Sequence, residues 1–226
     1  DLYAEKYGVR PMVVRNLSES YSDFPAVSRD FTGINKDDFL VILQGTGINI
    51  DKGAEELTDA IALTEGTSLI IVGSGDVITD IERKVMDQHL EDRIKFFGPV
   101  DSKTLAGYTR MADAGMCLEK DTNINYRYSL PNKLFDYLSA GIPVICSKLP
   151  ETAGIISNHK CGLLLEAVTP FEIAKAITLL KDDDSLYRGL RNNAEKAGAI
   201  LTWEEESIVV KELYGNIISK IKDGKN

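Results

Sequence analysis

Short apolar runs that alternate with segments of helical spacing constrain the fold of this chain more than any other feature. A run of four or five mostly apolar residues is typical of a strand that is buried on both faces of a sheet. Six such runs follow residue 38, at 39–43, 68–72, 93–97, 115–118, 143–146 and 162–165. Segments of helical character lie between most of them, at 53–64, 76–89, 101–112 and 132–140. Strands joined through helices need right-handed parallel crossovers, so we predict an α/β fold with a doubly wound parallel sheet.

The two ends of the chain differ from this alternating centre. After Thr169 the spacing is helical only, and three further helices are predicted, at 170–180, 183–200 and 204–221. Near the other end, Val13 and Val14 predict a short strand, and the polar residues around it indicate a linker or edge segment. We therefore divide the chain into a linker, residues 1–35, and a Rossmann-like domain with extra C-terminal helices, residues 36–226.

The composition argues against several classes of function. A net charge of −9 over 226 residues does not suit a protein that binds duplex nucleic acid, because such a protein needs a basic face. No run of 18 apolar residues is present, so no membrane-spanning helix is predicted. Cys117, Cys146 and Cys161 lie in or beside apolar runs, without the close pairs or neighbouring histidines of a metal cluster. This pattern favours buried thiols in the cytoplasm and no bound metal.

The loops after the predicted strands are the places to look for a ligand site. In an open parallel sheet, ligands bind beyond the carboxyl ends of the strands. The loop 45–53 after the first strand contains Gly47 and ends in Lys52-Gly53. Walker A chemistry is not expected, because no Ser or Thr follows the lysine. Lys52 can still reach a phosphate as a point charge, and a merely solvated lysine is the alternative.

Two further turns are weaker candidates. Gly73 and Gly75 follow the second strand, where glycine lets backbone approach a ligand closely. Val100 follows the third strand in a sharp turn, 98–101. Tight strand-to-helix turns use the same residues, so a structural role explains both turns equally well.

The segment 119–141 is the most informative part of the sequence. A long polar loop follows the fourth strand, and Pro131 stands where a helix should begin. The free N–H groups of that helix would point into the ligand crevice. Lys133 and Asp136 project from its first turns; the alternative to a ligand role is an ion pair between them on a solvated face.

The string Asn-Lys-Leu-Phe-Asp-Tyr-Leu-Ser-Ala-Gly-Ile-Pro-Val at 132–144 resembles the signature helix of family-4, GT-B-fold, retaining glycosyltransferases, the glycosyl transferases group 1. The other landmarks of that family follow in its order, at 45–53, 73–75, 97–100, 162–164 and Trp203. The resemblance covers residue 39 to the end and implies the C-terminal, nucleotide-sugar-binding half. Residues 1–30 resemble the segment that crosses between the two halves. We therefore expect a fragment that lacks the N-terminal, acceptor-binding domain.

The resemblance also implies roles for individual residues. Asp136 takes the place of the carboxylate that holds the ribose hydroxyls, and Lys52 that of the phosphate-binding lysine; these two are the expected catalytic residues. The nucleotide-sugar site implied is Gly47, Gly73, Gly75, Val100, Tyr128, Ser129, Asn132, Lys133 and Asp136. Two positions depart from the family, because Tyr128 stands where a glutamate is usual and Thr46 near the place of an arginine.

The implied activity is a retaining, hexosyltransferase-like transfer of sugar from a nucleotide diphosphate to a glycan, lipid or other acceptor. No cofactor and no metal are expected, and the fragment alone should be inactive. Any peripheral membrane association would come through the missing half. Two alternatives stay open. A nucleotide-sugar epimerase of the same fold would need acid and base groups near the sugar, and no histidine is placed for that. A non-catalytic nucleotide-binding module would explain Tyr128 and Thr46.

Overall fold

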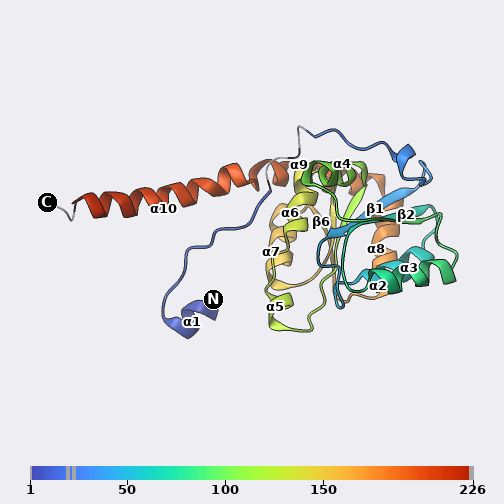
Figure 1. Cartoon of the computed structure of the whole chain (residues 1–226), viewed down its shortest axis with the longest axis horizontal. Helices are drawn as coiled ribbons and strands as arrows, with labels where there is room; N and C mark the ends of the chain where they lie inside the picture. Colours follow the sequence, from blue (N-terminus) through green and yellow to red (C-terminus); the bar gives the residue numbers. More distant parts are fainter. Residues whose placement is uncertain (1, 19–20, 22–23, 224–226) are drawn as a thin grey trace.

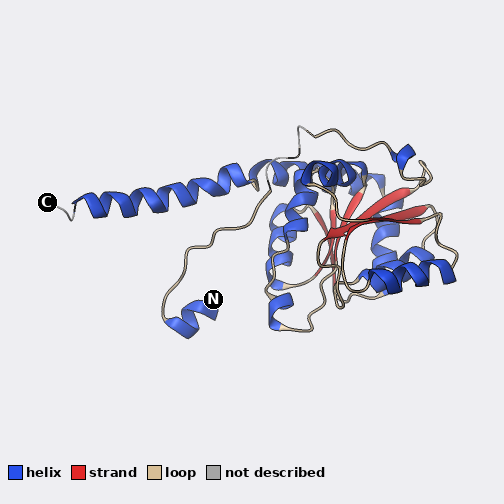
Figure 2. Cartoon of the chain, in the orientation of Figure 1, coloured by secondary structure: helices blue, strands red, loops and turns tan. Residues whose placement is uncertain are grey.

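The computed structural model describes residues 2–18, 21 and 24–223, which form one six-stranded sheet with helices on both faces (Figures 1 and 2). Every neighbouring pair of strands is parallel, and the strand order is β3-β2-β1-β4-β5-β6. The strands are β1 (Phe39–Gly45), β2 (Thr67–Gly73), β3 (Ile94–Phe97), β4 (Ala114–Cys117), β5 (Val144–Ser147) and β6 (Gly162–Leu165). The predicted doubly wound parallel sheet is confirmed.

The central strands are buried on both faces, which explains why their sequences are continuously apolar. In β1, Val41 and Leu43 enter the core on one face of the sheet, whereas Leu40 and Ile42 enter the core on the other. Successive side chains of a strand point to opposite faces, so a strand covered on both sides has no polar alternation. All four residues have no exposed surface.

Two layers of helices cover the sheet. The first core contains residues of α2 (Ala54–Ala62), α3 (Ile78–Asp87) and α8 (Pro170–Asp182). The second contains residues of α4 (Ser102–Met111), α6 (Asn132–Ser139) and α7 (Pro150–His159). Helix α9 (Asp184–Ile200) contributes to both, with Leu190 in the first core and Ala194 and Ala197 in the second.

The structure corrects several predictions about the elements. Val13 and Val14 form no strand; both are exposed, in an extended segment without a neighbouring strand. The sequence did not indicate α7, because only Thr152 and Ile156 of that helix are buried and no apolar stripe results. It also did not indicate the short helices α1 (Leu2–Tyr7), α5 (Ile124–Arg127) and the 3₁₀ turn η1 (Arg29–Phe31).

The segment before β1 is partly integrated into the domain. Leu17 and Ile34 are buried in the second core, and Tyr21 is buried as well. The backbone N–H and the guanidinium of Arg15 bond Glu206, and the N–H of Trp203 donates to the Ser18 carbonyl oxygen at 3.1 Å. Helix α10 (Trp203–Asp223) then extends away from the sheet (Figure 1). Residues 15–18 thus run along the start of the last helix.

Two expectations from composition can be compared with the structure. The three cysteines are free and buried, as predicted. Among the described residues, no helix combines the length and the apolar character needed to cross a membrane.

Candidate functional site

A cavity of about 460 Å³ lies at the carboxyl ends of β1 and β4. These two strands are neighbours at the point where the chain reverses its direction of travel across the sheet, which is where ligands bind in open α/β sheets. The cavity is lined by Gln44, Gly45, Thr46, Gly47, Lys52, Leu105, Glu119, Pro131, Asn132, Lys133 and Asp136. Five of the residues predicted from the sequence, Gly47, Lys52, Asn132, Lys133 and Asp136, are therefore brought together.

Two lysines and one buried glutamate form the charged part of this cavity. Glu119 lies two residues after the end of β4 and is 1% exposed. Its Oε1 lies 2.9 Å from the Lys133 Nζ and 3.6 Å from the Lys52 Nζ. The Lys52 Nζ also lies 4.4 Å from the centre of the Tyr126 ring, a cation–π contact. With two ammonium groups and one carboxylate, this triad carries one net positive charge, which suits an anionic ligand.

The ionisation of the triad follows from its burial and its charges. Burial raises the pKa of Glu119, but the ammonium groups of Lys133 and Lys52 outweigh burial and hold that pKa below its ordinary value. Burial lowers the pKa of Lys133, and the Glu119 carboxylate outweighs it and raises that pKa. Glu119 and Lys133 are therefore both charged near neutral pH.

Asp136 is buried, so it does not lie on the solvated face that the alternative interpretation required. Its Oδ1 accepts hydrogen bonds from the Ser18 hydroxyl and, at 3.1 Å, from the Tyr21 hydroxyl. Its Oδ2 accepts from the Gln44 Nε2 at 3.0 Å. Burial raises the pKa of Asp136, although all three hydrogen bonds oppose this. The alternative ion pair with Lys133 is not formed, because the Lys133 ammonium reaches Glu119 instead.

Gln44 connects Asp136 of α6 to Thr109 of α4, and the sequence did not indicate this residue. Its Oε1 accepts from the Thr109 hydroxyl at 2.7 Å, while its Nε2 donates to Asp136. A donor on one side and an acceptor on the other fix the orientation of the amide. Both Gln44 and Glu119 are polar residues at the carboxyl end of an otherwise apolar strand, and this position is the signal that could have identified them.

Gly73 and Gly75 do not line the cavity. A Cβ on Gly73 would overlap the Gly45 carbonyl oxygen, and a Cβ on Gly75 would overlap that of Ile48. The amide of Ser74 between them donates to the Gly45 carbonyl oxygen at 3.0 Å. These glycines thus let the loops after β1 and β2 pack backbone to backbone, which is the structural alternative left open above.

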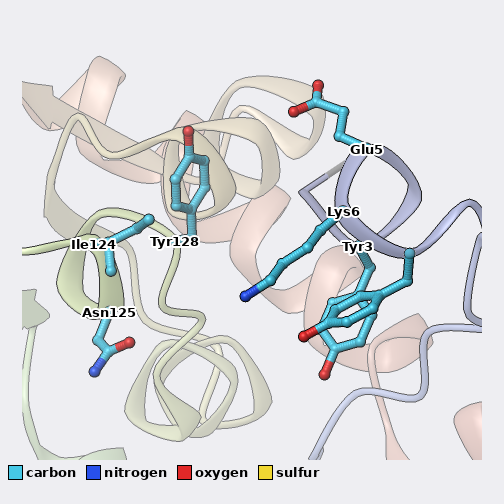
Figure 3. A pocket seen from close by; sticks show the side chains of 7 residues that line it. Tyr3, Glu5, Lys6, Ile124, Asn125 and Tyr128 are labelled. Atoms are coloured by element: carbon cyan, nitrogen blue, oxygen red, sulfur yellow. The ribbon is translucent and has the colours of Figure 1, made fainter.

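Val100, Tyr128 and Ser129 are also absent from the lining of this cavity. Tyr128 lines a second, open cavity of about 760 Å³ between α1 and α5, together with Lys6 (Figure 3). The Ser129 hydroxyl donates to the Tyr126 carbonyl oxygen at 2.9 Å. Of the predicted site residues, five therefore line the first cavity and Tyr128 lines the second, whereas Gly73, Gly75, Val100 and Ser129 line neither.

Comparison with known proteins identifies the family. The family model described as "Glycosyl transferases group 1" matches residues 27–197, which is more than half of the chain. The chain is 27% identical over 180 residues to the N-acetyl-alpha-D-glucosaminyl L-malate synthase of Bacillus anthracis, covering 77% of this chain and 45% of that protein. The chain spans about half the length of the curated relatives it matches.

Solved structures share the fold. Sucrose-phosphate synthase from Thermosynechococcus elongatus superposes with a TM-score of 0.78 at 22% identity, covering 97% of this chain and 56% of that chain. Anabaena Alr3699/HepE in complex with UDP and glucose superposes with a TM-score of 0.71 at 16% identity, covering 91% of this chain and 57% of that chain. The family match over 27–197 agrees with the sheet order and with the sequence of the segment 132–144. The chain therefore belongs to the glycosyl transferases group 1.

Proposed function

We propose that this chain is the nucleotide-sugar-binding half of a glycosyltransferase that moves a sugar from a nucleotide diphosphate to an acceptor. The observation that carries this proposal is the cavity between β1 and β4, where two ammonium groups stand beside the start of α6. Ammonium groups beside a helix N-terminus suit the diphosphate of a nucleotide-sugar donor. The solved complex of Alr3699/HepE with UDP and glucose is consistent with it.

The diphosphate would lie against the first turn of α6. Among the described residues, no side chain caps the N-terminus of this helix. The Leu134 N–H donates to the Pro131 carbonyl oxygen at 3.1 Å, so the N–H groups of Asn132 and Lys133 are the ones that would face a ligand. The helix dipole and the Lys52 ammonium would neutralise the charge that develops on the departing diphosphate as the glycosidic bond breaks. This stabilisation of the leaving group is the contribution that we assign to Lys52.

We assign the ribose to Asp136, with one refinement. The side chain lines the cavity one helical turn beyond Asn132, and helical side chains lean toward the N-terminus. Its Oδ1 already accepts two hydrogen bonds and its Oδ2 accepts one. A carboxylate oxygen has two lone pairs, so Oδ2 has room for one ribose hydroxyl. Asp136 would therefore hold one ribose hydroxyl rather than both.

Binding of nucleoside diphosphates to residues 1–226 tests the proposal. UDP, GDP and ADP are compared by thermal shift, where a ligand at a hundredfold its Kd should stabilise the fold by about 2.7 kcal/mol. Lys52→Ala should weaken the best diphosphate by about tenfold and the monophosphate less, because a charged hydrogen bond to phosphate is lost. Lys84→Ala is the matched control. Like Lys52, Lys84 is half-buried and ion-paired, but it lies on α3, outside this cavity.

Two outcomes would decide against the proposal. Failure of the wild-type chain to bind any of the three diphosphates would remove the nucleotide from this cavity. Equal affinities of Lys52→Ala and Lys84→Ala would remove Lys52 from the site.

A further inference from the structure

Glu119 is a buried carboxylate that contacts both lysines of the cavity, and it lies outside the sequence motifs described above. Its carboxylate is buried between three elements: Lys133 of α6, Lys52 of the loop after β1, and the Cys117 thiol of β4, which donates to Oε2 at 3.3 Å. The residue lines the same cavity as both lysines. A buried carboxylate with these partners influences both cations of the cavity at once.

The two lysines are held in different ways. The Lys133 Nζ lies 2.9 Å from Oε1, which is a hydrogen-bonded ion pair, and its side chain is 12% exposed. The Lys52 Nζ lies 3.6 Å from the same oxygen, beyond hydrogen-bond distance, and its side chain is 21% exposed. The positive charge of Lys133 is therefore compensated by the Glu119 carboxylate. Lys52 is attracted to Glu119 but makes no hydrogen bond to it, so its N–H donors stay available to a ligand.

We propose that Glu119 is a positioning residue for the diphosphate: it fixes Lys133 beneath the start of α6, holds Lys52 at the cavity, and limits the triad to one net positive charge. The inference rests on the proposed function and deepens it. Lys52 is the cation that contacts the diphosphate, and Lys133 is a buried counter-ion whose charge depends on Glu119.

The role of Glu119 makes the charge of Lys133 a testable quantity. Besides Glu119 and Lys52, the groups that face Lys133 are the thiols of Cys117 on β4 and Cys146 on β5. A hydrogen bond with Cys146, together with burial, raises the pKa of Cys117 well above its ordinary value, so that thiol stays neutral. In Glu119→Gln, burial would therefore lower the pKa of Lys133 with no anion to oppose it.

The experiment measures the Kd of the best of UDP, GDP and ADP from about pH 7 to about pH 9, above the last phosphate ionisation. The wild-type affinity should change little over this range. Glu119→Gln should bind at least as tightly as wild type wherever Lys133 stays protonated, because it then carries two ammonium groups. It should then lose about tenfold or more as Lys133 deprotonates, which is the contribution of one charged interaction. Adding Lys133→Met to Glu119→Gln should abolish this pH dependence.

Asp184→Asn is the matched control, because it breaks an exposed ion pair with Arg188 at 2.9 Å. Its pH profile should follow the wild type. A Glu119→Gln profile parallel to the wild type, together with a double variant Glu119→Gln/Lys133→Met that binds no more tightly than Lys133→Met, would overturn the inference while leaving the proposed function intact. Absence of nucleotide binding by the wild type would overturn both.

A rescue experiment keeps the inference falsifiable if Glu119→Gln does not fold. Lys133→Met alone leaves Glu119 beside Lys52 and should weaken diphosphate binding by about tenfold, because the net charge falls to zero. Lys133→Met with Glu119→Gln restores one positive charge and removes both members of a buried pair, which proteins tolerate better than the loss of one. The double variant should therefore bind more tightly than Lys133→Met. If it binds no more tightly, Glu119 does not set the charge of the site.

Discussion

At the scale of single residues, the sequence predicted roles for Asp136 and Lys52, which both line the cavity, but did not predict their surroundings. The donors that surround Asp136 come from Ser18 and Tyr21, which lie 118 and 115 positions away in the sequence. No local pattern reports such distant partners, so the sequence left an ion pair on a solvated face open as the alternative for Asp136. Gln44 and Glu119 were missed for a related reason, because a polar residue at a strand end is most often solvated.

Replacement of Asp136 tests the importance of its buried contacts. Asp136→Ala leaves three hydrogen-bond donors without their acceptor, so it should lower the free energy of unfolding by about 2 kcal/mol or more in urea denaturation. Asp136→Asn keeps one acceptor oxygen and should be less destabilising. The Asn variant should also lose most of the wild-type preference for a ribonucleoside diphosphate over its 2′,3′-dideoxy form, about tenfold.

Asp136→Ala with wild-type stability would mean that the three donors find other partners. An Asn variant that discriminates against the dideoxy form as well as the wild type does would assign the ribose to another residue.

At the scale of elements, the sequence predicted the strands and helices whose burial produces a regular pattern of apolar residues. All six strands were found, because strands covered on both faces must be continuously apolar. Helices that bury a full stripe, such as α8, were found as well. Helix α7 buries only Thr152 and Ile156, and α5 buries none of its residues, so neither leaves a pattern. The contact of residues 15–18 with α10 depends on tertiary structure alone.

The ion pair between Arg15 and Glu206 should govern how firmly the segment 15–18 is held. The hydrogen bond from the Arg15 side chain holds the pKa of Glu206 below its ordinary value. A carboxylate with a depressed folded-state pKa stabilises the contact at neutral pH, and this stabilisation is lost as the pH falls through that pKa. Glu206→Gln should therefore increase amide hydrogen exchange at 15–18 near neutral pH.

Glu204→Gln is the control for this measurement, because Glu204 is exposed on the same first turn of α10. It should leave exchange at 15–18 unchanged. Equal exchange in the Glu206 and Glu204 variants would show that the backbone contacts of the segment hold it without the ion pair.

At the scale of the whole molecule, the chain has a cavity at the carboxyl ends of β1 and β4 and about half the length of its curated relatives. We expect residues 1–226 to bind a nucleotide sugar without transferring the sugar. Mass spectrometry of the donor, incubated with the chain or with a longer form of the protein and candidate acceptors, measures this. Sugar transfer by residues 1–226 alone would contradict the expectation. Epimerised donor without acceptor would favour the epimerase alternative.

The pairing of residues 15–18 with the start of α10 has a mechanical consequence. Arg15 and Glu206 are 191 positions apart, and Ser18 and Trp203 are paired beside them, so the two ends of the chain leave the domain at one point, as Figure 1 shows. Tension applied between the two ends would break these contacts one after the other, beginning with Arg15–Glu206. The strands of the sheet would bear no force until both contacts had broken. Stretching forces would therefore release the end segments before the sheet, and the release of Ser18 would remove one hydrogen-bond donor from Asp136 in the cavity.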